Sequence, residues 1–219
     1  MQVVPLNARV PVSRRRRKEA RPAELIDAAI EVFAEKGFAA SRLEDVARRA
    51  GVSKGTAYLY FPNKEALFKA AVGEVIVTRI ATGEREVEEW RGSTGELLRH
   101  VLQRWALVIS SRRGGLLKLI VAEARNFPEL AAWYHAEVAE RGQRLLRAVL
   151  QRGVERQEFR AIDVEAVSLV IAAPMAFRAI WAHSLGACEA SPLSDERFNA
   201  AYFDFMVAGL RARSLSDGG

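Results

Sequence analysis

The chain of 219 residues is poor in the side chains that most often hold metals or perform catalysis. It has one cysteine and three histidines. A single thiol, Cys188, cannot form an intramolecular disulfide or a CxxC metal or redox site, and this is typical of a reducing compartment. His100, His135 and His183 lack HExxH spacing, and the sequence has no GxSxG elbow, Walker loop or strand-linked GxGxxG motif. We therefore predict no enzyme, no metal and no cofactor.

Long apolar runs are missing as well. The N-terminal charges are not followed by the apolar core of a signal peptide. The longest strongly apolar run without a charge, residues 166–177, is shorter than the roughly 20 residues that a membrane span needs. We expect a cytoplasmic protein with no membrane partner.

From Pro22 onward, apolar residues recur at helical spacing and no strand pattern interrupts them. Gly37 closes the first helix, Ser41 to Glu44 form a capping box for the second, and the third lies between the cap Ser53 and Pro62. Further helices are predicted at 64–90, 94–109, 115–126, 128–152, 163–185 and 195–211. The fold class is all-α with about nine helices.

Residues 42–61 combine two short helices with a tight turn at Gly51, the arrangement of a helix-turn-helix. In this geometry the second helix projects from the body and enters a DNA major groove. Gly55 costs about 1 kcal/mol relative to alanine inside a helix, and close approach of a phosphate backbone would explain it. The outward residues are expected to be Lys54, Gly55, Thr56, Tyr58 and Tyr60, although both tyrosines also fit a core.

Lys64 is a cation in the first turn of the next helix, where it opposes the helix dipole. A DNA phosphate docked at that N-terminus would be bound by Lys64 together with the free backbone amides. The alternative is that the Lys64 side chain simply points into water.

Two motifs in this region carry a family resemblance: AEKGF at residues 34–38 and AGVSKGT-Y-YFPNKEALF at residues 50–68. They resemble the N-terminal domain of the TetR family of bacterial transcriptional regulators. The resemblance implies a homodimeric, ligand-responsive repressor of a palindromic DNA operator. It implies a three-helix DNA-binding domain over 22–70 and a larger ligand-binding and dimerisation domain over 71–219. By position, the DNA contacts are Ser41, Lys54, Gly55, Tyr58, Tyr60 and Lys64.

Leu59 departs from the family pattern, because several relatives have a polar or aromatic residue there. A leucine offers only apolar contact, for example to a thymine methyl group. A known operator sequence therefore cannot be transferred to this chain.

The net charge of +6 lies in one segment. Residues 1–21 hold seven basic residues and one acidic residue, and bases and acids balance in the remainder. This segment is predicted to be a flexible arm, either merely solvated or following DNA phosphates and the adjacent minor groove. The neutral body argues against a non-specific architectural protein. The arginines expected to contact DNA are Arg14, Arg15, Arg16 and Arg17.

The last two predicted helices are apolar around most of their circumference, so they are buried within the chain or against a partner. In the resembled family the last two long helices pair across a two-fold axis, while an ordinary monomeric core is the alternative. The residues expected at a dimer interface are Val167, Ile171, Met175, Phe203, Met206 and Leu210.

Aromatic residues on the middle helices are candidates for a pocket that binds a small apolar or amphipathic effector. Each of them also fits an ordinary core, and a carrier of apolar ligands with a vestigial helix-turn-helix is a rival interpretation. Residues 116–133 resemble the C-terminal domain of AcrR-like efflux and stress regulators. The candidate pocket residues are Trp105, Trp133, Tyr134, Phe177, Arg178 and Trp181.

Overall fold

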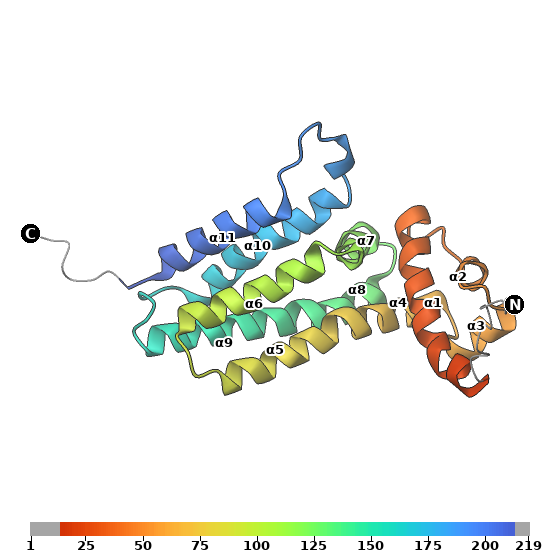
Figure 1. Cartoon of the computed structure of the whole chain (residues 1–219), viewed down its shortest axis with the longest axis horizontal. Coiled ribbons are helices and arrows are strands. Elements are labelled where there is room, and N and C mark those ends of the chain that lie inside the picture. Colours follow the sequence, from red (N-terminus) through yellow and green to blue (C-terminus); the bar gives the residue numbers. More distant parts are fainter. Residues whose placement is uncertain (1–13, 213–219) are drawn as a thin grey trace, which may run out of the picture.

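The computed structural model describes residues 14–212, without the side chains of residues 14–20 and 112. This part of the chain forms nine continuous helices and no strand, with one isolated bridge between Phe159 and Arg211. The long helix α1 and the short helices α2 and α3 form one end of the molecule, and the remaining helices are stacked beside them (Figure 1). The predicted all-α architecture is confirmed.

The N-terminal end contains the first three helices and the beginning of the fourth. Their bounds are α1 (Arg14–Lys36), α2 (Leu43–Arg49), α3 (Lys54–Tyr60) and α4 (Lys64–Val72). A π-helical segment, η1 (Gly73–Val77), joins α4 without a break to α5 (Thr78–Glu89). The predicted helix over 64–90 is thus continuous and leads from the N-terminal helices into the larger part of the molecule.

The remaining helices form the larger part of the molecule (Figure 1). They are α6 (Thr94–Ile109), α7 (Gly115–Glu123), α8 (Pro128–Tyr134), α9 (Arg141–Glu155), α10 (Val164–Ala182) and α11 (Asp195–Leu210). A second π segment, η3 (His135–Glu140), joins α8 to α9, and short 3-10 turns lie at η2 (Arg112–Gly114) and η4 (Gly186–Cys188). Each predicted helix in this half is present, with its ends shifted by at most a few residues.

The start of α1 differs from the prediction. The helix begins at Arg14, and Pro22 lies inside it. Arginine, lysine, glutamate and alanine are good helix formers, so the preceding residues propagate the helix although Pro22 lacks one backbone donor. The predicted flexible arm is therefore wrong for residues 14–21, and residues 1–13 lie outside the described part. The expected DNA contacts of Arg14 to Arg17 rest on side chains that are not described.

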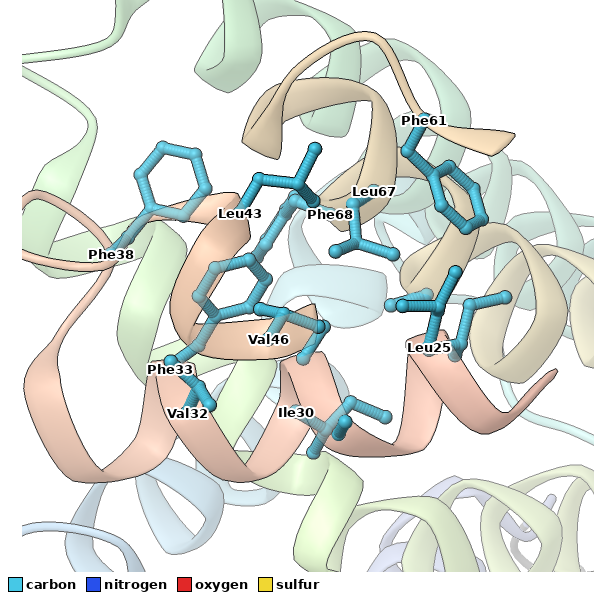
Figure 2. Packing of buried hydrophobic residues seen from close by; sticks show 14 of the residues in the cluster. Leu25, Ile30, Val32, Phe33, Phe38, Leu43, Val46, Phe61, Leu67 and Phe68 are labelled. Atoms are coloured by element: carbon cyan, nitrogen blue, oxygen red, sulfur yellow. The ribbon is translucent and has the colours of Figure 1, made fainter. Parts of the chain in front are cut away.

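Helices α1 to α4 enclose a core built around three aromatic rings (Figure 2). Phe38 lies 5.3 Å from Phe33 and 5.5 Å from Phe68 between ring centroids, and all three side chains are buried. The same buried cluster continues into α7 and α8 through Leu116 and Leu130. The predicted domain boundary near residue 70 therefore does not interrupt the hydrophobic core.

A second core lies among α6, α9, α10 and α11. It is made of fully buried aliphatic side chains such as Leu97, Leu102 and Leu146, and Phe159 closes one end. Arg152 on α9 donates to the carbonyls of Val87 and Trp90, at 3.1 and 2.7 Å, and so caps the end of α5. The larger half is thus a helical bundle with its own interior.

Gly153 gives a test of this packing. A Cβ at this position would lie 2.1 Å from Cδ2 of the buried Phe159 ring. We expect Gly153→Ala to lower the free energy of unfolding by about 1–3 kcal/mol through overpacking, measured by urea denaturation. Gly73→Ala is the control, because a Cβ there meets nothing within 4 Å. Equal stability of the two variants would contradict this packing.

Candidate nucleic-acid interface

The segment from α2 to α3 has the geometry of a helix-turn-helix. Gly51 adopts a positive φ of 66°, which turns the chain between the two helices. Ser53 caps α3 by accepting a 3.1 Å hydrogen bond from the backbone of Thr56. Ala57 is the one fully buried residue of α3, and most of the other residues of this helix are presented outward.

The outward surface of α3 carries a cation, an aromatic ring and a leucine. The Lys54 side chain is 66% exposed, Tyr58 is 43% exposed and Leu59 is 75% exposed. A Cβ at Gly55 would meet only Ser53 Oγ, at 3.9 Å, so packing within the chain does not require a glycine there. This surface is available to a macromolecular partner that approaches the helix closely.

Glu44 on α2 organises this surface. Its Oε1 lies 2.7 Å from Lys54 Nζ and accepts a 3.3 Å hydrogen bond from the Tyr58 hydroxyl. The contact with Lys54 lowers the pKa of Glu44, and the same contact raises the pKa of Lys54, so both groups stay charged at neutral pH. A carboxylate therefore occupies the place on Lys54 that a phosphate would take. Sequence reasoning missed this role, because Glu44 was assigned to a capping box.

Two of the predicted contact residues on α3 face inward more than expected. The Thr56 hydroxyl lies 2.8 Å from the Ser53 hydroxyl and belongs to the cap of the helix. Tyr60 is half-buried and packs against the first core. Tyr58 is the more open of the two tyrosines, while Tyr60 has a packing role as well.

Ser41 is not placed as expected. It is buried, and its hydroxyl donates a 2.5 Å hydrogen bond to the carbonyl of Gly37 at the end of α1. The residue that precedes α2 is Arg42, whose backbone N–H donates to Asp45 at 3.3 Å. The predicted capping box is therefore wrong by one residue. Ser41 closes the turn after α1 and does not offer its hydroxyl to DNA.

Lys64 is also engaged within the chain. Its ammonium donates to the carbonyls of Phe38 and Ala39, at 2.8 and 2.9 Å, and lies 4.7 Å from the Phe38 ring and 5.2 Å from the Phe127 ring. Carbonyls near a helix C-terminus attract a cation, and this contact outweighs the unfavourable dipole of its own helix. In this structure the Lys64 ammonium is therefore neither free to bind a phosphate nor directed into water, the two alternatives expected from the sequence.

A cavity of about 260 Å³ lies in the larger half, between the long helices. Both π segments, η1 and η3, contribute to its wall, and Trp105 and Tyr134 line it as predicted. Burial raises the pKa of Tyr134, so its hydroxyl stays protonated and can donate to a ligand. The walls are otherwise mainly aliphatic, from residues such as Ile80, Leu117 and Met175.

The other four predicted pocket residues lie elsewhere. Trp133 packs on the first core beneath Lys69, and Phe177 is 61% exposed on the outside of α10. Arg178 pairs with Asp195 at 2.9 Å, and the Trp181 indole donates to Glu189, so both hold the segment between α10 and α11. Helical spacing shows which residues share a face, but it does not show which neighbouring helix that face meets.

Polar residues of the cavity wall were not predicted from the sequence. Arg79, Arg113 and Gln143 line it, and no aspartate or glutamate does. The Gln143 Oε1 atom is buried and has no hydrogen-bond partner among the described residues. These side chains are scattered over α5, η2 and α9, and no local motif marks them.

The predicted dimer interface requires a correction. Ile171, Met175, Phe203 and Leu210 are buried in the chain's own second core, and Val167 and Met206 are half-buried against it. The apolar surface that remains open on these helices consists of other residues: Leu169, Val170, Phe177 and Phe205, each at least 57% exposed. Both sides of α10 are apolar, so the sequence could not distinguish the inner side from the outer one.

By length and composition alone, α10 is long and apolar enough to cross a membrane. In the structure 22% of its most apolar stretch is buried. Its buried residues Ile171, Met175 and Ala179 pack into the bundle. The exposed apolar side chains therefore form one surface of a packed helix.

Comparison with known proteins identifies both halves of the chain. Residues 25–71 match the family described as bacterial regulatory proteins, tetR family, and residues 91–196 match a tetracyclin repressor-like C-terminal domain. The fatty acid metabolism regulator protein of Bacillus subtilis is 48% identical over 65 residues, which are 27% of this chain and 34% of that protein. The match thus spans about a third of that relative's length. YdeS, an uncharacterized HTH-type regulator of the same organism, is 26% identical over 75% of this chain and 80% of its own.

Solved structures share the whole fold. The regulator FadR from Bacillus subtilis in complex with stearoyl-CoA has a TM-score of 0.68 at 23% identity, and the match covers 86% of this chain and 99% of FadR. A ketosteroid transcriptional regulator of Mycobacterium tuberculosis has a TM-score of 0.70 at 20% identity, covering 88% and 96% of the two chains. At these identities the likeness shows the fold alone.

The ion pair between Glu44 and Lys54 generates a prediction about DNA binding. Glu44→Gln removes the carboxylate that competes with a phosphate, so we expect DNA affinity to rise about two- to fivefold. Lys54→Gln is expected to weaken binding and to lower the slope of log affinity against log salt by about 0.9. Both are measured by fluorescence anisotropy over a salt series.

Glu24→Gln provides the matched control, because it removes the same charge from α1, where Glu24 pairs with Arg21 of its own helix. If Glu24→Gln strengthens DNA binding as much as Glu44→Gln does, the effect is general electrostatics and the specific competition at Lys54 is contradicted.

Proposed function

The chain belongs to the TetR family of bacterial regulatory proteins, and from this premise we propose that it is a homodimeric repressor controlled by a small-molecule effector. It acts in the cytoplasm on a palindromic operator and releases the DNA when the effector binds. One observation carries the proposal: a single continuous helix, from Lys64 to Glu89, connects the helix-turn-helix with the wall of an apolar cavity.

On the DNA side, α3 is the recognition helix. We assign phosphate contact to Lys54, close backbone approach to Gly55, and contact with the groove to Tyr58 and Leu59. The exposed Leu59 offers apolar contact, which suits a thymine methyl group in the major groove. Thr56 and Tyr60 lie on the same helix and contribute at its edges. The expected contact of Arg14 to Arg17 with phosphates remains a prediction.

On the effector side, the cavity suits an apolar chain. Its walls are mainly aliphatic and aromatic, and Tyr134 and Gln143 supply one donor and one acceptor. A relative in sequence is a fatty acid metabolism regulator, and a protein of the same fold is solved with stearoyl-CoA. We propose an effector with a long acyl chain.

The dimer interface is assigned to the open apolar surface of α10 and α11. Leu169, Val170, Phe177 and Phe205 lie on these two helices, which a 2.5 Å hydrogen bond from the Tyr202 hydroxyl to the Ile171 carbonyl holds together. A second copy related by a two-fold axis would cover this surface with the same residues. Such a dimer would present two recognition helices to one face of the DNA.

The proposed function is tested with DNA from upstream of the chain's own gene. Footprinting is expected to show one symmetric protected site, and anisotropy is expected to show loss of binding when palmitate or palmitoyl-CoA is added. Quenching of Trp105 in the cavity wall reports on occupancy. Absence of a specific site at low salt would favour a carrier of apolar ligands. A specific site that neither lipid affects would contradict the acyl effector.

Phe205→Glu tests the dimer. A buried carboxylate at the centre of an apolar interface is costly, so we expect the variant to run as a single chain in light scattering, where the parent runs as two. Leu107→Glu is the matched control, since Leu107 is 68% exposed on α6 and is not part of the proposed surface of α10 and α11. A Phe205→Glu variant that stays dimeric would place the interface elsewhere.

A further inference from the structure

Arg113 belongs to two sites at once. It lines the effector cavity, and its guanidinium donates from Nη2 to Asp27 Oδ1 at 3.1 Å. Asp27 lies on α1, in the half of the chain that carries the helix-turn-helix. This ion pair therefore joins the cavity wall to the DNA-binding half across a sequence separation of 86 residues.

We propose that the effector carries an anionic head group, and that this group takes Arg113 away from Asp27 when the acyl chain fills the cavity. The inference rests on the proposed acyl-binding cavity and adds its charge requirement and its link to α1. Ligand occupancy and the Asp27–Arg113 ion pair then compete for one guanidinium.

The charges of the cavity support an anion. Two guanidiniums, those of Arg79 and Arg113, stand on a wall that holds no carboxylate. Arg79 forms no ion pair or hydrogen bond within the described part of the chain. An apolar cavity whose wall holds one unpaired guanidinium, and a second that is held only by Asp27, suits an amphipathic anion, in which a carboxylate or phosphate accepts from a planar guanidinium fork.

The geometry around Arg113 allows its side chain to exchange partners while its backbone stays in place. Ser111 Oγ accepts a 3.2 Å hydrogen bond from the Arg113 N–H and donates a 2.6 Å bond to the Val108 carbonyl. The next residue, Gly114, has no room for a side chain, because a Cβ would lie 2.1 Å from the Ile109 carbonyl oxygen. The turn is fixed by these contacts, whereas the Arg113 side chain is 37% exposed and is held by one ion pair.

Asp27 connects the exchange of partners at Arg113 to helix α1. Its neighbours Ile26 and Ala28 are buried in the first core, while the Asp27 side chain is 66% exposed and points to Arg113. Loss of the pair removes a direct tie between α1 and η2. An exposed ion pair of this kind changes an equilibrium between two conformations by at most about fivefold. The exchange therefore contributes only part of the coupling between effector binding and DNA binding, once in each protomer.

The test uses the full-length protein and three lipids that share one chain: palmitate, palmitoyl-CoA and uncharged palmityl alcohol. Arg113→Gln is expected to weaken binding of the anions about tenfold or more, while binding of the alcohol changes less than twofold. Arg113→Lys, which keeps the charge without the fork, is expected to fall between the two. The anion that the parent binds more tightly, and that loses more affinity in Arg113→Gln, identifies the head group as a carboxylate or as the phosphates of coenzyme A.

Asp27→Asn tests the competition from the other side. Removing the competitor is expected to raise affinity for the anion about two- to fivefold and to lower DNA affinity without ligand by a similar factor per protomer, as reciprocity of coupling requires. Glu24→Gln is the control for charge loss on α1, and Arg99→Gln is the control for an exposed arginine paired with aspartate away from the cavity, at 2.8 Å from Asp204.

The outcomes separate this inference from the proposed function. If the parent protein binds neither anion more tightly than palmityl alcohol, or if Arg113→Gln binds both anions as the parent does, the ion-pair exchange is overturned and the acyl cavity stands. If Asp27→Asn leaves anion affinity unchanged, the competition is overturned. If the parent binds none of the three lipids, both the exchange and the acyl effector are overturned.

Discussion

The packing of Phe38 against Phe127 joins the two halves of the molecule. Phe38 follows α1 and is fully buried, and its ring meets Phe127 edge-on at 4.8 Å and Phe68 at 5.5 Å. Lys64 lies over two of these rings and holds the carbonyls that follow α1. Because protein interiors are closely packed, a shift of α8 must displace the start of α4 and the end of α1.

This shared core explains how a short helix-turn-helix is held against a large bundle. Helices α2 and α3 are only seven residues long each, and α3 contributes one fully buried side chain. Their orientation also depends on α4, α7 and α8, which line the cavity of the larger half or continue into helices that do. The position of α3 therefore changes when the spacing of α4, α7 and α8 changes.

Two carboxylates, one at the proposed DNA-binding surface and one beside the cavity, each pair with a cation that an outside anion could bind. Glu44 occupies Lys54 on the recognition surface, and Asp27 occupies Arg113 beside the cavity. In each case a cation suited to an anionic partner is already paired within the chain, and the partner must replace an internal acid. The exchange lowers the net gain of binding, because the internal ion pair must break before the cation can bind the partner. It also favours partners whose charge and shape match the site better than a single carboxylate does.

The sequence by itself determined the helices, the helix-turn-helix and the family, because these depend on local signals: apolar periodicity, the cap Ser53, the left-handed glycines Gly37 and Gly51, and two dense motifs. Tertiary structure alone decided the partners of individual side chains. Ser41 and Lys64 bind carbonyls near the end of α1, Ile171 faces inward while Leu169 faces outward, and Arg113 meets both the cavity and Asp27. The physical reason is that periodicity fixes which residues share a face of a helix, whereas only the packing of helices distant in sequence fixes what that face touches.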